Sequence, residues 1–183
     1  MDLAFFISLV PYRVEVKRMN KTRLITTMAV FIAIGTISAQ LIWFPAGVAK
    51  AYPVQHAINV MAAVALGPGP AVVIAFMISL LRNMLGLGTF LAFPGAMVGA
   101  FLAGLLYKRT EKKSLAAAGE GVGSGIIGAL FAVPFAHVFM GSSVGAFAFI
   151  PAFLVSSVSG AILGLLVVTK LYNRSTARGY GRL

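Results

Sequence analysis

The sequence predicts an all-α membrane protein, a bundle of six transmembrane helices with both termini in the cytoplasm. Of its 183 residues, 60% are hydrophobic and only 10% are charged, whereas soluble domains carry roughly 25% charged residues. Apolar segments separated by Gly, Pro and charged residues recur along the chain. A spanning helix needs about 20 mostly apolar residues, so this length allows six crossings. These observations favour a multi-pass protein of the cell membrane over a soluble enzyme.

Six apolar segments are the predicted spanning helices. Their ranges are 24–42, 53–66, 70–85, 90–107, 115–139 and 144–171. The first ends before Trp43, a residue type enriched at membrane interfaces. The fifth contains Pro134, which predicts a kink. The second and third are short and flanked by Gly and Pro. Such segments are tolerated at membrane depth where protein or a cavity covers the freed backbone groups, so their outer ends are a candidate site.

Short segments precede and follow the predicted transmembrane domain, which covers residues 19–174. The apolar run 3–10 is too short to span a bilayer and is broken by Pro11. We interpret residues 1–18 as an N-terminal extension, either a misassigned start or a loose interfacial segment, with Met19 as the more natural start. Residues 175–183 form a basic tail that is expected in the cytoplasm.

The basic residues predict the orientation of the helices. With six crossings, thirteen of the fifteen fall on one side: Arg13, Lys17, Arg18, Lys21, Arg23, Lys108, Arg109, Lys112, Lys113, Lys170, Arg174, Arg178 and Arg182. Only Lys50 and Arg82 fall on the other side. Cytoplasmic loops of membrane proteins carry an excess of Lys and Arg, so this side is the expected cytoplasmic one. The same rule accounts for the net charge of +11 without a nucleic-acid partner.

Five polar or charged residues cluster at the outer start of the second predicted helix. They are Lys50, Tyr52, Gln55, His56 and Asn59. His56 and Asn59 are three residues apart and therefore share a helix face. An aromatic ring, an imidazole and an amide together suit a small polar heteroaromatic ligand. The alternative interpretation is interfacial snorkelling and helix capping.

Three other regions place candidate site residues at the same outer end. Arg82 and Asn83 end the third predicted helix, where Arg82 could pair with an acid, cap the helix C-terminus or hold a ligand oxygen. Phe93 begins the fourth and could provide an aromatic wall, although a lipid-facing ring is the alternative. His137 lies late in the fifth and could reach the pocket, or it could be an ordinary interface histidine.

Glu120 is the only acid inside a predicted span. It is about seven residues, or roughly 10 Å, past the basic loop, and we expect it nearer the cytoplasmic side than the outer cluster. A structural or coupling role is therefore favoured over ligand contact. The chain has no cysteine and no H-E-x-x-H, G-x-S-x-G or P-loop pattern. The sequence thus favours a non-enzymatic protein that uses no cofactor or metal of its own.

Pairs of small residues spaced four apart recur on the predicted helices. The pairs are Ala29 and Ala33, Gly95 and Gly99, Gly121 and Gly125, and Gly160 and Gly164. In lipid such pairs let two helix backbones approach closely. We expect the three glycine pairs to pack inside the bundle. Ala29 and Ala33 lie in the cytoplasmic half of the first predicted helix and could dock a second membrane protein.

Several motifs resemble those of a known transporter family. They are AKAYPVQH at 49–56 with Asn59, LRNMLGLGT at 81–89, LAFPG at 91–95, GAFLAGLLY at 99–107 and GEGVGSGIIG at 119–128. Together, over residues 19–174, they resemble the substrate-binding S components of energy-coupling factor transporters, and most closely the ThiW type.

This resemblance implies a six-helix subunit of an ATP-driven vitamin uptake transporter, here for the thiazole precursor of thiamine, hydroxyethylthiazole. It implies a transmembrane coupling protein that docks at Ala29 and Ala33, and two ATPase subunits that use the ATP. It also implies that the loop 44–52 gates the site. The absence of an outer acid fits a neutral precursor better than cationic thiamine. The alternatives are a self-sufficient secondary transporter of a polar heteroaromatic metabolite, with Glu120 as the coupling residue, and a membrane enzyme, which the lack of a catalytic set disfavours.

Overall fold

The computed structural model describes residues 19–46, 49–141 and 146–177. The predicted N-terminal extension, residues 47 and 48 of the predicted gate and the tail from residue 178 onward lie outside the described residues. The described elements are α2 (Lys21–Leu41), β1 (Phe44–Ala46), β2 (Ala49–Ala51), α3 (Pro53–Leu66), α4 (Pro68–Met84), α5 (Ala92–Thr110), α6 (Lys113–Val122), η2 (Gly123–Ile127), α7 (Gly128–Met140) and α8 (Ala146–Ala177).

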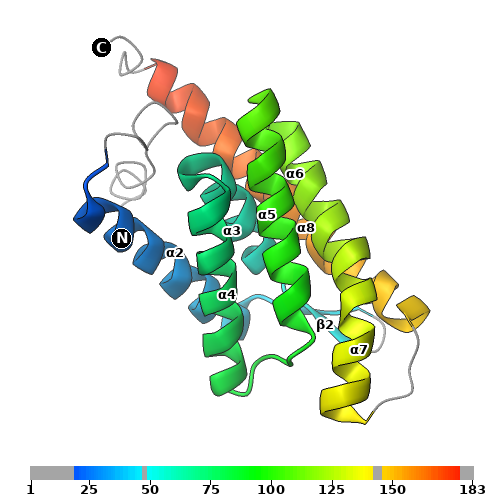
Figure 1. Cartoon of the computed structure of the whole chain (residues 1–183). Helices are drawn as coiled ribbons and strands as arrows, with labels where there is room; N and C mark the ends of the chain where they lie inside the picture. Colours follow the sequence, from blue (N-terminus) through cyan, green and yellow to red (C-terminus); the bar gives the residue numbers. More distant parts are fainter. Residues whose placement is uncertain (1–18, 47–48, 142–145, 178–183) are drawn as a thin grey trace.

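The helices form one bundle in which each predicted span overlaps an observed helix. Figure 1 shows the α5–α6 connection and the C-terminal end of α8 at the top of the view, and β2, the α4–α5 connection and the end of α7 at the bottom. Within the described residues, Lys21–Leu41, Lys113–Val138 and Phe149–Asn173 are long and apolar enough to cross a membrane. Pro53–Leu66 and Pro68–Met84 are shorter apolar helices.

A β-hairpin departs from the all-α prediction. β1 pairs antiparallel with β2, with Phe44 opposite Ala51 and Ala46 opposite Ala49. Because the pairing satisfies backbone groups between α2 and α3, this connection is an ordered element rather than an open loop. The sequence predicted a loop over 44–52, and three-residue strands are too short to give the alternating pattern that would have indicated a hairpin; the fold class is otherwise all-α.

The fifth predicted helix contains a π-helical segment that was not expected from Pro134. α6, η2 and α7 follow one another without a break, and η2 covers Gly123–Ile127. Pro134 lies inside α7. A π-helical turn contains an extra residue and often lies at a functional site. Here it includes Ser124, whose side chain contacts residues of other helices.

Small residues allow the helices to pack closely. A Cβ atom added at Gly160 of α8 would overlap the carbonyl of Pro53 and the side chain of His56, and one at Gly164 would lie 2.9 Å from the carbonyl of Ala57. The packing role predicted for the glycine pairs is confirmed at both positions. Gly121 is different, because its Cβ would meet only a methyl of Val158 at 3.8 Å.

Many large apolar side chains lie on the outside of the bundle, including those of Leu41, Val138 and Leu166. In water such exposure would be unfavourable, whereas in a bilayer it places apolar surface against lipid tails. The interior between α3, α4 and α5 is filled mainly by alanine with Ile74 and Ile78. This packing is typical of a membrane protein, in which small residues line helix interfaces.

Candidate functional site

A cavity of about 480 Å³ lies between the hairpin, the first turns of α3 and α5, the end of α4, and α8. Its wall is formed by Lys50, Tyr52, Gln55, His56, Arg82, Gly86, Leu87, Gly88, Thr89, Leu91, Ala92, Gly95, Ala96, Ser124, Phe149, Ala152, Phe153 and Ser156. Most of the lining surface is apolar, with polar side chains from several elements at separate places. Mostly apolar cavities with a few placed polar groups are typical small-molecule sites.

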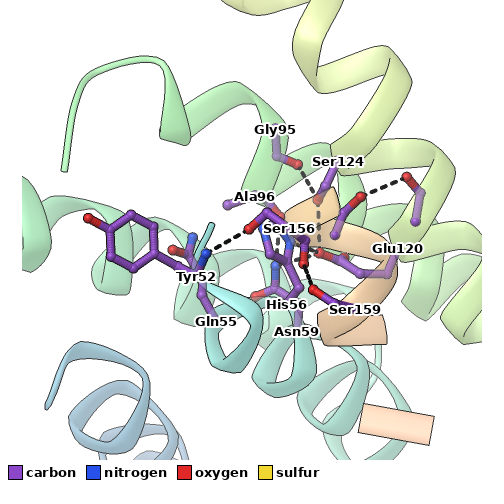
Figure 2. Close-up of polar contacts among 12 residues, drawn as sticks. Tyr52, Gln55, His56, Asn59, Gly95, Ala96, Glu120, Ser124, Ser156 and Ser159 are labelled. Carbon is purple, nitrogen blue, oxygen red and sulfur yellow. Dashed lines mark hydrogen bonds and ion pairs between the residues drawn. The ribbon is translucent and has the colours of Figure 1, made fainter. Parts of the chain in front are cut away.

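The hairpin is attached to α8 and forms one side of the cavity. The backbone N–H of Tyr52 donates to Ser156 Oγ on α8 over 2.9 Å, as Figure 2 shows. On β2, Lys50 Nζ lies 4.1 Å from the ring centre of Trp43. The bond from Tyr52 holds the end of this connection to α8, whereas the contact between Lys50 and Trp43 lies within the connection itself.

Arg82, at the end of α4, is buried in the cavity wall with only 3% of its surface exposed. Its Nη1 donates to Gln55 Oε1, and its Nη2 donates to the carbonyl of Leu87 over 3.2 Å. Its guanidinium carbon lies 3.8 Å from the ring centre of Tyr52. Gln55 Nε2 in turn donates to Ser79 Oγ over 3.3 Å. Of the three roles predicted for Arg82, pairing with an acid is not seen among the described residues.

Glu120, on α6, is fully buried and is hydrogen-bonded to side chains of α3 and η2. Its Oε1 lies 2.8 Å from His56 Nδ1 and accepts hydrogen bonds from Asn59 Nδ2 over 3.0 Å and from Ser124 Oγ over 2.8 Å. Ser124 Oγ also lies 2.9 Å from the carbonyl oxygen of Gly95 on α5. Figure 2 shows this network of carboxylate, imidazole, amide and hydroxyl groups.

The prediction that Glu120 lies apart from the outer cluster is wrong, because it contacts both His56 and Asn59. α3 is short, with 14 residues, so it begins inside the bundle. Its first turns therefore lie beside the continuous helix formed by α6, η2 and α7, where His56 meets Glu120. The expected structural role agrees with these contacts, and Glu120 is not among the residues that line the cavity.

The contact with Glu120 determines which nitrogen of His56 carries a proton. Glu120 Oε1 already accepts from Asn59 and Ser124, so it acts as an acceptor toward His56 Nδ1. His56 Nδ1 therefore carries the hydrogen, and Nε2 is the nitrogen left for a ligand. The His56 side chain is 13% exposed and lines the cavity. A carboxylate bonded to one imidazole nitrogen fixes the ring and its tautomer.

Three polar atoms of this region are buried without a hydrogen-bond partner in the described part of the chain. They are Asn59 Oδ1, Arg82 Nε and Glu120 Oε2. Buried polar atoms are normally paired, so each exception calls for an explanation. Glu120 Oε2 has room only because residue 99 is glycine: a Cβ there would overlap Ser124 Oγ and the Glu120 carboxylate.

The structure brings together most, but not all, of the predicted site residues. Lys50, Tyr52, Gln55, His56 and Arg82 line the cavity. Asn59 is not among the lining residues, and its Nδ2 donates to Glu120 Oε1 and to the carbonyl of Ala96, which lines the cavity. Asn83 instead donates to the carbonyls of Ser79 and Thr89.

Phe93 and His137 lie outside the cavity wall. The ring of Phe93 packs against Phe76 and Phe90, with centre-to-centre distances of 5.6 and 6.2 Å. His137 is exposed near the end of α7. Neither residue therefore lines the cavity, where a role as a site residue was predicted for both.

Ser124, Phe153 and Ser156 line the cavity without being among the predicted site residues. A signal for the serines was present, because hydroxyl side chains inside apolar helices commonly bond across helices. Phe153 had no such signal, since a phenylalanine in a spanning helix is equally suited to lipid.

The predicted docking residues lie on a different surface. Ala29 and Ala33 are exposed on α2, one turn apart. Neither is among the residues that line the cavity. On the same helix Phe31 and Gly35 are buried against the bundle, so the two alanines are on its outward face.

Comparison with known proteins assigns the chain to a family. The model of the thiamine-precursor transporter protein family, ThiW, matches residues 25–174, which cover all the elements that form the cavity. No curated protein and no solved structure matches the chain. With its apolar helices the chain is a multi-pass membrane protein, and it belongs to the ThiW family of thiamine-precursor transporters.

Proposed function

We propose that the chain is the substrate-binding membrane subunit of an ATP-driven uptake transporter for the thiazole precursor of thiamine, hydroxyethylthiazole. The observation that carries the proposal is a mostly apolar cavity of about 480 Å³, with a few polar side chains in its wall, in a chain of the thiamine-precursor transporter family. That volume lies within the range of about 300–1,000 Å³ typical of small-molecule sites.

The chemistry of the wall supports a small heteroaromatic ligand. Tyr52, Phe149 and Phe153 provide aromatic surface for a thiazole ring. His56 Nδ1 is taken up by Glu120, which leaves Nε2 to form a hydrogen bond with the ligand hydroxyl. No carboxylate is among the lining residues, which disfavours a cation such as thiamine.

Energy would come from partner subunits. We propose that Ala29 and Ala33 dock a transmembrane coupling protein, which two ATPase subunits drive. The support is that both alanines are exposed on α2, where small residues let another helix approach closely. The sequence contains no P-loop of its own.

We further propose six crossings, with both termini and the α5–α6 connection in the cytoplasm. This counts α6, η2 and α7 as one crossing. It places Lys108, Arg109, Lys112 and Lys113 inside, in agreement with the charge rule. Cysteine labelling from each face of the membrane tests this, with single cysteines at residues 112 and 181 that should both react only from inside.

A binding and transport experiment tests the function. Purified protein in lipid nanodiscs should bind hydroxyethylthiazole, measured by calorimetry, and should bind thiamine and the pyrimidine precursor far more weakly. Proteoliposomes containing the coupling protein and ATPases should accumulate the thiazole only with ATP. Tight binding of thiamine with no thiazole binding would contradict the proposal.

Secondary transport is the second candidate, and one observation favours it. Glu120 is a buried carboxylate with Oε2 unpartnered among the described residues, and such groups carry coupling protons in pumps and transporters. Uptake driven by an ion gradient, without ATP or other subunits, would decide for this alternative.

A further inference from the structure

The charged residues of the cavity wall are all positive. Arg82 lines it from α4 and Lys50 from β2, and no carboxylate is among the lining residues. The described part of the chain contains only two acids. Glu111 follows α5, on the connection to α6, and Glu120 uses its Oε1 for His56, Asn59 and Ser124. Within the described residues, therefore, no carboxylate neutralises Arg82.

This lack of a counter-charge is unusual because Arg82 is only 3% exposed. A buried guanidinium is costly unless it is paired and hydrogen-bonded. The contacts of Arg82 are neutral: the amide oxygen of Gln55, the carbonyl of Leu87 and the face of Tyr52. A guanidinium carries five N–H donors, and Nε has no partner. The group therefore retains donor capacity beside an open cavity.

A purely structural role accounts for only part of this arrangement. The bond from Arg82 to the Leu87 carbonyl does fasten the chain just after α4. The second cation of the wall, Lys50, comes from a separate element and contacts the ring of Trp43 rather than an acid. Figure 2 shows Tyr52 and Gln55, two partners of Arg82, on the side of the site away from Glu120. The cavity wall thus has the cationic Arg82 near Tyr52 and Gln55, and His56, held from behind by the buried Glu120, at another place.

We propose that Arg82 and Lys50 form an oxyanion subsite, so that the cavity also takes thiazoles whose side chain carries a carboxylate or a phosphate and binds them more tightly than the alcohol. Guanidinium groups match the geometry of both oxyanions, which form charge-assisted hydrogen bonds with them. The inference rests on the proposed function, since it assumes a thiazole ligand, and it extends the ligand class from the alcohol to its acidic derivatives. His56 and the aromatic residues would hold the ring.

Three ligands with the same 4-methylthiazole ring test this inference. They carry at position 5 a hydroxyethyl group, its phosphate ester or a carboxymethyl group. Calorimetry in nanodiscs should show at least one acidic ligand binding about 10- to 100-fold more tightly than the alcohol, as expected for hydrogen bonds to charged groups. Which acid binds more tightly distinguishes phosphate from carboxylate. If the alcohol binds as tightly as both acids, the subsite is overturned while the proposed function stands.

Two variants and one control test the residues. Arg82→Gln and Lys50→Gln should weaken the acidic ligand more than the alcohol, whereas a structural defect would weaken both equally. Arg109→Gln changes an exposed cation at the end of α5, outside the cavity wall, and should change neither.

A probe other than a thiazole tests the subsite even if no thiazole binds and the proposed function fails. Inorganic phosphate, titrated at constant ionic strength, should still raise the unfolding temperature of the wild type and not that of Lys50→Gln. Equal responses to phosphate, or no response, would then overturn the subsite too.

Discussion

His56 on α3 and Glu120 on α6 are joined by a hydrogen bond of 2.8 Å, although 64 residues separate them in the sequence. His56 lines the cavity, whereas Glu120 lies behind it and is fully buried. The orientation of a cavity-lining ring is therefore set by a carboxylate on another helix. Asn59 and Ser124 bond to the same oxygen. A shift of α6 would therefore move the His56 ring and change its contact with the ligand.

Replacing Glu120 with alanine should disrupt both folding and binding. It removes the shared acceptor of three donors, and each buried donor left unsatisfied costs about 1–3 kcal/mol. We expect a lower unfolding temperature in detergent and a loss of ligand affinity. Glu120→Gln keeps an acceptor oxygen for His56 Nδ1 and should recover much of the stability. Equal behaviour of the two variants would contradict the positioning role of Glu120.

Gly99→Ala should damage the site without changing any polar residue. Its Cβ would overlap Ser124 Oγ and the Glu120 carboxylate, and overpacking of this kind costs about 1–3 kcal/mol. We expect weaker ligand binding by calorimetry and a lower unfolding temperature. Gly121→Ala is the matched control, because that Cβ meets only Val158, at 3.8 Å. If Gly121→Ala lowered ligand affinity and the unfolding temperature as much as Gly99→Ala, the steric explanation would be excluded.

Ser156→Ala should loosen the hairpin on the cavity. It removes the acceptor for the backbone N–H of Tyr52, a bond worth about 0.5–1.5 kcal/mol. We expect faster ligand dissociation in stopped-flow measurements, by up to about 10-fold. Ser159→Ala is the control, since Ser159 bonds only to carbonyls of its own helix, those of Val155 and Ser156. Unchanged dissociation in Ser156→Ala would argue against a gating hairpin.

Bulky residues at Ala29 and Ala33 should prevent assembly while leaving ligand binding intact. Leucine at both positions adds side-chain volume on the exposed face of α2, and close helix approach requires small residues there. Copurification of the coupling protein and ATPases should fall, with calorimetry on the isolated subunit unchanged. Ala118→Leu, at an exposed alanine of α6, should assemble normally. If the double variant still copurifies with the coupling protein and the ATPases, α2 is not the docking helix.

The helix positions were largely predictable because apolar runs and Gly or Pro boundaries decide them. The second predicted helix, for example, begins and ends where α3 does, at Pro53 and Leu66. The start of α4 differs by two residues: Gly67 adopts a φ of 83° that ends α3, and Pro68 then begins α4. Pro is well suited to a first helical position, so either Pro68 or Pro70 satisfied the pattern.

The site was only partly predictable, because charge and polarity identify unusual residues but not their partners. Lys50, His56 and Arg82 stand out in an apolar chain, and all three line the cavity. Their contacts depend on the depth and rotation of helices, which composition does not specify. That is why Glu120 was placed apart from His56. For the same reason His137, an equally unusual residue, is exposed on α7.

The π-helical segment Gly123–Ile127 gives this helix one place where its length can change. A π-helical turn takes up one extra residue within an α-helix, so deleting one residue there would leave a regular helix. The lipid-facing Leu130 and Phe131 would keep their direction, and Glu120 would keep its place. An α-helix turns about 100° per residue, so the same deletion within α6 or α7 would instead rotate one part of the helix against the other by that angle.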